Sequence, residues 1–524
     1  MTARVILGDE PLSIEQVVAL ARATPPGAGG ADTVVVEISD GAWERVRASR
    51  AVVEALADDV IPHYGISTGF GALATTHIPA DKRTQLQRSL IRSHAAGSGA
   101  EVEQEVVRAL MLLRIQTLAT GRTGIREETL RTYLGLLNSG MTPIVHEYGS
   151  LGCSGDLAPL AHCALVLMGE GWVRNPARER RTGAEALAAA GLAPVVLAEK
   201  EGLALINGTD GMLGMLCMAI HDLRRLVTTA DLAAAMSVEG LLGTDDVFAA
   251  DLQALRPQPG QALSAANMRK VLAVSGIRDS HRDPDACTRV QDAYSLRCAP
   301  QVAGAVRDTL DHAARVAGWE LASTVDNPVV TLDGRVESNG NFHGAPVAYV
   351  LDFLAIAAAD LASMSERRTD RFLDKARSNG LPPFLADDPG VDSGLMIAQY
   401  TQAGIVAELK RLAVPASADS IPSSAMQEDH VSLGWTAGRK LRRAVDGLTR
   451  VLAIELLAAC RGIRLRAPLT PSPVSAAVIG ALGDVARVEP GPDRVLADDI
   501  EAAVRAVADG LPIAAAESVA GPLD

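Results

Sequence analysis

The chain has 524 residues, of which 48% are hydrophobic and 21% charged, and its formal net charge is −14. This composition is typical of a globular protein with a large core, and the length favours roughly two to four domains. Because acidic and basic residues are interspersed and the balance is negative, the composition argues against a nucleic-acid-binding surface.

The first part of the chain is predicted to mix helix and strand and to carry a long loop. Apolar spacing indicates a helix at 12–23, β-branched residues indicate a strand at 33–39, and a second helix follows at 41–57. Residues 61–82 contain three glycines and a proline near each end, which is typical of a loop. Long connections without regular structure are usually functional, so we expect this loop to contribute to a site.

After this loop the sequence becomes strongly helical. Apolar residues recur at helical spacing in the segments 101–121, 212–241, 302–322, 344–368, 395–414 and 432–461. Several of these segments are apolar on more than one face, which is typical of helices buried in a large bundle or an oligomer. The clearest later strand signal is a hairpin predicted at 328–338 around Asp333 and Gly334.

We therefore predict a mainly α protein, with a long central helix bundle and a smaller N-terminal α/β part that carries the Gly-rich loop. The predicted domains are 1–120, with the loop, 121–510, with the helical bundle, and a C-terminal tail at 511–524 that is expected to fray. The polar motifs lie at breaks between helices, and such breaks can converge on one pocket at the end of a bundle.

The sequence predicts neither a secretory leader nor a membrane span. The N-terminal stretch has no basic region followed by an apolar one, and no apolar run approaches the roughly 18 residues that cross a bilayer. The six cysteines are scattered without a CxxC pair, which favours reduced thiols and disfavours a zinc site. We expect a cytoplasmic protein without a metal.

The stretch GCSGDLAPLAH at 152–162 contains two candidate nucleophiles, Cys153 and Ser154. A GxSxG elbow requires a glycine two residues after the serine, where this chain has Asp156. A thiol nucleophile requires a neighbouring histidine, which sequence alone cannot place. Chemistry of the backbone is the third possibility.

In that third possibility the amide nitrogen of Gly155 attacks the carbonyl carbon of Cys153, and two waters are lost. One of these waters carries away the Ser154 hydroxyl, and the product is an electrophilic methylidene-imidazolone ring. Glycine permits the backbone bend that ring closure requires, and serine supplies the leaving hydroxyl. The first residue contributes only its carbonyl, so its side chain is free to vary.

This stretch resembles the signature of the histidine and phenylalanine ammonia-lyase family. Other segments resemble that family in the same order along the chain: YGISTGFG (64–71), LQRSLIRSHAAGSG (86–99), KEGLALINGT (200–209), VQDAYSLRCAPQVAGA (290–305), TVDNPVV (324–330), NGNFHGAPVA (339–348), SERR (365–368) and SSAMQEDHVSLG (423–434). The resemblance implies a mainly helical homotetramer whose active sites are built from more than one chain. It also implies 4-methylidene-imidazol-5-one, formed from Cys153, Ser154 and Gly155, as the cofactor, with no metal or nucleotide.

The resemblance implies a role for several further residues. Tyr64 is expected to take the β-proton of the substrate, and because a phenol titrates near 10 it needs cationic or hydrogen-bonding help. Asn207 is expected to touch the ring or the substrate amine, and Tyr294 to hydrogen-bond near the electrophile. Arg297 is expected to grip the α-carboxylate through a bidentate pair.

Two more residues are expected near the substrate, namely Phe342 as a wall of the ring pocket and Gln291 beside the Tyr–Arg pair. Structural alternatives exist for these assignments. They are a helix N-cap or a turn position before Asp156 for Ser154, a left-handed turn for Asn207 and a surface ion pair for Arg297.

The choice of substrate depends on two places in the sequence. Ser93 and His94 stand where phenylalanine lyases of the family have Phe-Leu and tyrosine lyases His-Leu, and the pair is similar to that of histidine lyases. Glu428 stands where phenylalanine lyases have Gln, and a buried carboxylate is costly unless the substrate ring carries an N–H. Together they imply L-histidine as substrate, with trans-urocanate and ammonia as products. The alternative for Glu428 is a helix N-terminal position.

The chain also departs from the family pattern. Cys153 stands where Ala or Thr is usual, Met426 where histidine lyases have Asn, and Arg92 where Leu is common. A Pro and a Gln of the pattern are replaced by Ala293 and Asp210. These departures leave open a lyase or 2,3-aminomutase for another amino acid, and an inactive helical scaffold is the alternative from a different class.

Overall fold

The computed structural model describes residues 2–24, 33–59, 61–283, 287 and 290–524, and contacts group the chain into two units. Unit 1 comprises Met1–His221, Ala314–Asp352 and Pro415–Arg439. Unit 2 comprises Asp222–Ala313, Phe353–Val414 and Lys440–Asp524. Each unit is assembled from separate stretches of chain, and the division into 1–120, 121–510 and 511–524 stays a prediction.

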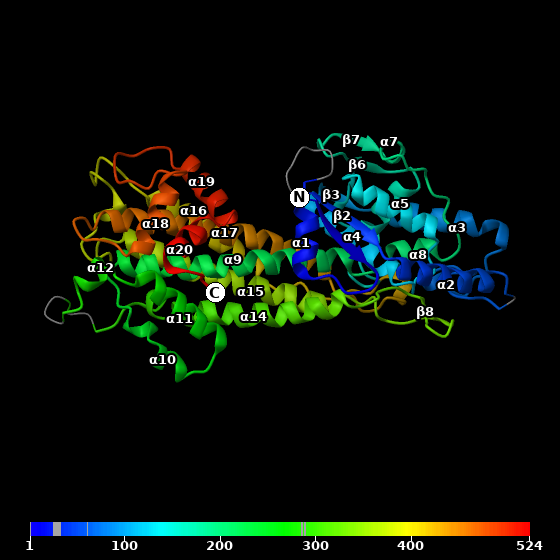
Figure 1. Cartoon of the computed structure of the whole chain (residues 1–524), viewed down its shortest axis with the longest axis horizontal. Coiled ribbons are helices and arrows are strands. Elements are labelled where there is room, and N and C mark those ends of the chain that lie inside the picture. The colour runs from blue at the N-terminus through cyan, green and yellow to red at the C-terminus, as the bar shows by residue number, and fades with distance from the viewer. Residues whose placement is uncertain (1, 25–32, 60, 284–286, 288–289) are drawn as a thin grey trace. The chain divides into compact units, whose positions relative to one another are not determined.

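Unit 1 combines short strands with helices (Figure 1). Its strands are β1 (Thr2–Leu7), β2 (Thr33–Ile38), β3 (Ser98–Glu101), β4 (Thr142–Pro143), β5 (His146–Tyr148), β6 (Trp172–Arg174), β7 (Arg180–Thr182), β8 (Val329–Val330) and β9 (Val336–Glu337). Its shorter helices are α1 (Ile14–Arg22), α2 (Asp40–Ala57), α3 (Arg83–His94), α4 (Gln104–Ala119), α5 (Glu127–Asn138), α6 (Leu157–Leu167), α7 (Gly183–Ala189) and α8 (Glu201–Ile206). β1 and β2 pair in parallel, and β2 alternates between buried and half-buried residues as a strand with one covered face does.

Four long helices contribute many buried residues to the core: α9 (Asp210–Gly240), α14 (Ala299–Leu321), α15 (Ala345–Leu373) and α17 (Gly434–Arg464). Each of them contributes residues to both units. Nearly every residue of α9 is buried, which explains why its sequence is apolar on more than one face. The prediction of a mainly α protein is confirmed.

Unit 2 contains further helices, which are α10 (Ala250–Ala254), α11 (Pro259–Leu272), α12 (Gly276–Asp279), α13 (Tyr294–Arg297), α16 (Met396–Leu412), α18 (Pro473–Gly483), α19 (Ala497–Ala508) and α20 (Leu511–Ala520). The prediction of a fraying tail is wrong, because α20 packs against α18. The backbone N–H of Asp524 donates to Asn267 Oδ1 at 3.1 Å, so the last residue is also tethered.

The predicted elements of the N-terminal part are confirmed. The helix at 12–23 is α1, the strand at 33–39 is β2, and the loop at 61–82 contains only two 3₁₀ turns, Gly71–Leu73 and Ala80–Lys82. The hairpin is also confirmed, since β8 and β9 pair in antiparallel fashion and Gly334 in their connection has φ +80°.

No uninterrupted apolar run of about 18 residues occurs in α15, where Asp352 and Asp360 interrupt the apolar residues, but its average hydropathy is high. Among the described residues it is the one helix that reaches the necessary length and hydropathy. However, 67% of its most apolar stretch is buried inside the protein, as in the core helix of a globular domain.

Candidate active site

Cys153, Ser154 and Gly155 lie in a tight turn immediately before α6. Gly155 has φ +76°, and the backbone N–H of Asp156 donates to the carbonyl oxygen of Gly208 at 2.7 Å. A Cβ atom at Gly155 would lie 2.1 Å from that oxygen, so only glycine fits this position. The chain is therefore bent tightly at Gly155, against Gly208.

Two helices begin beside this turn. Asp156 is the N-cap residue of α6, and its Oδ2 atom accepts the backbone N–H groups of Gly211 and Met212 in the first turn of α9, each at 2.9 Å. Both helix N-termini, which carry partial positive charge, therefore lie next to the tripeptide. Burial raises the pKa of Asp156 to about 7. Because Asp156 is the cap, the N-cap alternative for Ser154 is wrong.

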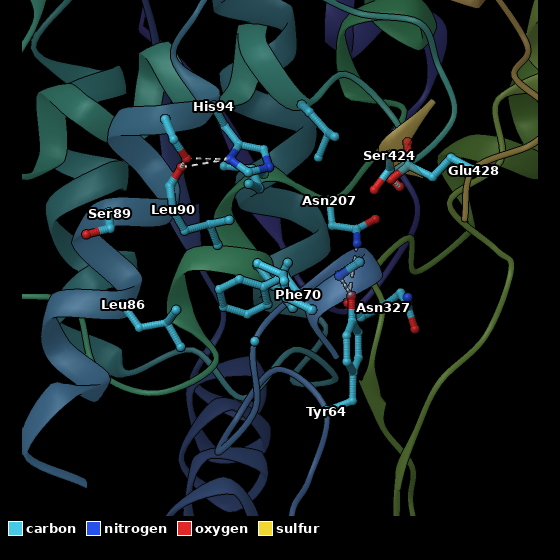
Figure 2. Close-up of a pocket in the computed structure, with 18 of the residues that line it drawn as sticks. Tyr64, Phe70, Leu86, Ser89, Leu90, His94, Asn207, Asn327, Ser424 and Glu428 are labelled. Atoms are coloured by element: carbon cyan, nitrogen blue, oxygen red, sulfur yellow. Dashed lines mark hydrogen bonds between the residues drawn. The ribbon is translucent and has the colours of Figure 1, made fainter. Parts of the chain in front are cut away.

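Ser154 lines a cavity of about 470 Å³ in unit 1 (Figure 2). The walls come from the Gly-rich loop, α3 and α8, and include Phe70, Leu73, Ile78, Leu86, Leu90, Leu203 and Ile206. The polar groups that line it include Tyr64, His94, Asn207, Asn327 and Glu428. Apolar walls with a few polar groups are typical of a pocket for a small molecule.

A second cavity of about 450 Å³ adjoins the same residues. Its lining includes Tyr64, Cys153, Ser154, Asn327, Phe342, His343, Glu428 and His430. Tyr64, Ser154 and Glu428 line both cavities. The turn formed by Cys153, Ser154 and Gly155, called the reactive turn below, therefore lies where the two cavities meet.

His94 presents a hydrogen-bond acceptor to the first cavity. Its Nδ1 atom lies 2.9 Å from the carbonyl oxygen of Leu90, a contact that assigns the ring proton to Nδ1 and leaves Nε2 as an acceptor. Burial lowers the pKa of His94, although the bond to Leu90 and the charge of Glu428 act in the opposite direction. The imidazole is therefore neutral at pH 7.

Glu428 accepts hydrogen bonds from both side chains of the reactive turn. Cys153 Sγ donates to Glu428 Oε2 at 2.9 Å, and Ser154 Oγ donates to Oε1 at 3.4 Å. Glu428 forms an isolated antiparallel β-bridge with Ser423 and is not in a helix. The helix N-terminal alternative is therefore wrong. Burial and the bond to Glu428 raise the pKa of Cys153 to about 12. A thiol in this state is protonated and is no nucleophile.

The Tyr64 hydroxyl accepts the backbone N–H of Gly71 at 3.4 Å. Burial raises the pKa of Tyr64, and the negative charges of Glu428 and Asp326 add to this effect, while the bond from Gly71 opposes it. Of the cationic or hydrogen-bonding help expected for Tyr64, the groups that shift its pKa provide the hydrogen bond from Gly71 but no cation, and the phenol is protonated at neutral pH.

Asn207 is buried at the C-terminal end of α8 with φ −99° and ψ 89°, so the left-handed alternative is wrong. Its Nδ2 atom donates to the carbonyl oxygen of Asn327 at 3.3 Å. Its Oδ1 atom is buried and has no hydrogen-bond partner among the described residues. Buried polar atoms are nearly always paired, so this oxygen is available to a bound ligand.

Three of the expected site residues belong to unit 2. Tyr294 and Arg297 share one face of α13 as the spacing predicts, with the guanidinium carbon 4.9 Å from the centre of the phenol ring. The Tyr294 side chain is 70% exposed. Neither of these residues nor Gln291 is among the residues that line the two cavities.

Arg92 and Met426, which depart from the family pattern near the specificity residues, do not line the cavities. Arg92 forms an ion pair with Glu170 at 2.8 Å, and Met426 is 68% exposed. Neither side chain lines the first or the second cavity. The two residues therefore give no structural reason against a histidine-type pocket.

Sequence reasoning missed two histidines at the second cavity. The rings of His343 and His430 stack with centres 5.5 Å apart and an interplanar angle of 1°. Each follows a predicted residue within the same motif, NFHG and EDH, which was the available signal. Asn327, in the TVDNPVV segment, also lines both cavities. Within the part of the chain that the structure describes, no cluster of His, Cys, Asp or Glu could hold a metal ion.

The chain resembles known proteins in both sequence and structure. Residues 12–484 match the model of the family described as aromatic amino acid lyase. The histidine ammonia-lyase of Streptomyces griseus is 65% identical over 521 residues, which cover 99% of each chain. The crystal structure of histidine ammonia-lyase from Trypanosoma cruzi has a TM-score of 0.88 at 38% identity and covers 98% of this chain and 95% of that one. Tyrosine aminomutase from Streptomyces globisporus has a TM-score of 0.90 at 36% identity over 99% of each chain.

Proposed function

Because the chain belongs to the aromatic amino acid lyase family, we propose that it is a histidine ammonia-lyase, a carbon–nitrogen lyase that converts L-histidine to trans-urocanate and ammonia. The observation that carries the choice of substrate is the pair of acceptors, His94 Nε2 and the Glu428 carboxylate, in one cavity with Ser154. A ring that bears an N–H can donate to one of these acceptors, whereas a benzene ring offers no donor to either.

We further propose that Cys153, Ser154 and Gly155 cyclise to 4-methylidene-imidazol-5-one. The left-handed backbone of Gly155 and the lack of space for a Cβ atom fit a glycine that must approach a neighbouring carbonyl closely. When formed, this group supplies an electrophile that activates the amino acid for loss of ammonia. The adjoining N-termini of α6 and α9 favour negative charge that develops nearby.

The remaining residues orient the substrate. The apolar walls of the first cavity enclose the imidazole ring, and the unpaired Oδ1 atom of Asn207 accepts a hydrogen bond from the substrate amine. Tyr64 lies at the junction of the cavities and takes the β-proton. Burial and the charges of Glu428 and Asp326 raise the pKa of Tyr64. We therefore expect a cationic group to lie near its hydroxyl when Tyr64 acts as a base.

We also propose a homotetramer in which a different chain supplies Tyr294, Arg297 and Gln291 to the site. One chain exposes an apolar stripe on α15, formed by Tyr349, Phe353 and Ile356, which are 58%, 48% and 43% exposed. Residues four and three apart lie on one face of a helix, and such exposed stripes mark contacts between proteins. All six cysteines are free thiols, which supports the proposed cytoplasmic location.

The test is the ultraviolet absorbance of purified protein mixed separately with L-histidine, L-phenylalanine, L-tyrosine and L-tryptophan. We expect a rise only with histidine, from urocanate, and no rise with Ser154→Ala, which lacks the hydroxyl that ring closure removes. An unchanged rate in Ser154→Ala would contradict the cyclisation. A β-amino acid among the products would identify an aminomutase, and a whole-protein mass without loss of two waters would favour the inactive scaffold.

A further inference from the structure

The side chain of Cys153 makes a contact that the proposed chemistry does not use. The residue is 6% exposed, and its Sγ atom donates to Glu428 Oε2 at 2.9 Å. The hydroxyl of Ser423 donates to the same oxygen at 3.1 Å. The backbones of Ser423 and Glu428 also exchange hydrogen bonds, at 2.8 and 3.2 Å. One carboxylate oxygen is thus held from two sides, by its own loop and by the reactive turn.

Ring closure changes which donors remain at this carboxylate. The first water takes the Cys153 carbonyl oxygen with the amide hydrogens of Ser154 and Gly155. The second takes the Ser154 hydroxyl with the Cα hydrogen of the same residue, so the 3.4 Å contact from Ser154 to Oε1 is lost. The Cys153 side chain takes no part in the reaction and keeps its S–H group. Oε1 becomes available to a substrate, while Oε2 remains fixed by Cys153 and Ser423.

We propose that Cys153 is a positioning residue whose thiol donates a hydrogen bond to Glu428 and holds that carboxylate toward the ring N–H of the substrate. The proposal rests on the proposed function, because only a ring with an N–H makes use of an oriented carboxylate. Burial and the neighbouring carboxylate raise the pKa of the Cys153 thiol to about 12, so the donor persists at neutral pH. The thiol thereby couples the reactive turn to the residue that selects the substrate.

The experiment compares Cys153→Ala, which removes the donor, with Cys153→Ser, which keeps one. Whole-protein mass should show loss of two waters in both variants, because only the carbonyl of this residue reacts. We expect Cys153→Ala to raise the KM for L-histidine about 5- to 20-fold with a much smaller change in kcat, as loss of a hydrogen bond to a charged group predicts. Cys153→Ser should stay within about 2-fold of the wild type in KM.

A double-mutant cycle identifies the partner of the thiol. In a Glu428→Gln background, Cys153→Ala should change KM by less than about 2-fold, because the contact no longer involves a charged acceptor. A KM in Cys153→Ala equal to that of the wild type would overturn the proposal, as would effects that simply multiply in the double variant. A whole-protein mass of Cys153→Ala without the loss of two waters would overturn the proposal too, because the thiol would then act in ring formation. A wild type that does not convert histidine would overturn the proposed function first, and this assignment with it.

Discussion

The proposed cyclisation of the backbone depends on the absence of a Cβ atom at Gly155. Its amide lies in a left-handed bend against Gly208, where any side chain would collide with a carbonyl oxygen. We expect Gly155→Ala to keep its full mass, without the loss of two waters, and to form no urocanate. Gly404→Ala is the matched control, because a Cβ there meets nothing within 4 Å and should leave the water loss intact. Normal water loss in Gly155→Ala would show that the bend is not required.

Glu428 tests the choice of substrate at the residue scale. Glu428→Gln keeps the size of the side chain and removes the negative charge that faces the ring. We expect the variant to lose at least about 10-fold in kcat/KM for L-histidine and to change much less for L-phenylalanine, which has no ring N–H to bind. Initial rates with both amino acids provide the measurement. Equal losses on both substrates would remove Glu428 from specificity.

Some of the residues that the motifs indicated line the cavities, but their conformations were not predictable. Asn207 and Glu428 line the first cavity, and for them the sequence left a left-handed turn and a helix start open as alternatives. The observed backbone decides both, because Asn207 has φ −99° and Glu428 pairs with Ser423. The thiol–carboxylate contact joins residues 275 positions apart, and local sequence rules carry no information on such pairs.

At the scale of elements, a buried ion pair connects α8 to the segment before β8. Lys200 Nζ donates to Asp326 Oδ2 at 2.6 Å, and both side chains are fully buried. Asp326 also accepts the backbone N–H of Asn327 at 2.8 Å, which links the pair to the lining of the cavities. Burial lowers the pKa of Lys200 and raises that of Asp326, with the partner's charge opposing each shift.

We expect Lys200→Met to destabilise the protein by about 3–5 kcal/mol, because it leaves the Asp326 charge buried without its partner. The double variant Lys200→Met/Asp326→Asn should lose less, since no unpaired charge remains. Urea unfolding of the variants gives the comparison. Arg335→Ala, which breaks an exposed pair with Asp333, is the control and should change stability by less than about 1 kcal/mol. A double variant no more stable than Lys200→Met would contradict this account.

Periodicity predicted the long helices well, because a helix buried on most of its surface repeats apolar residues at every turn. Periodicity did not predict the last helix. The segment LPIAAAESVA, expected to be a tail, forms α20 and packs against α18. Periodicity could not foresee α8, which has six residues and follows Lys200 in a left-handed conformation that is rare for a residue with a side chain.

At the scale of the whole molecule, the two units alternate along the chain, so consecutive boundaries describe them poorly. A helix such as α15 carries residues of both units, and no change of composition marks the transition. Sequence reasoning finds domain boundaries from linkers and changes of composition, but most of these transitions fall inside the long helices α9, α14, α15 and α17.

The apolar stripe on α15 makes the assembly testable. We expect Phe353→Glu to shift the protein to smaller assemblies, because a charge in a subunit contact is costly to desolvate. Light scattering after size exclusion measures the mass. Val495→Glu, which alters an apolar residue that is 68% exposed on a loop, should leave the assembly unchanged. An unaltered mass in Phe353→Glu would mean that subunits meet elsewhere.

The proposal that sites are shared between chains can be tested with two inactive variants. Ser154 lines the cavities of unit 1, whereas Arg297 belongs to unit 2 and lines neither of them. Ser154→Ala and Arg297→Ala should each lose nearly all activity alone. If each site takes its tripeptide and its arginine from different chains, random co-assembly of the two variants restores about a quarter of the sites. Co-expression with two affinity tags, followed by a urocanate assay of doubly purified protein, measures the recovery. Hybrids as inactive as the parents would place both residues of each site on a single chain.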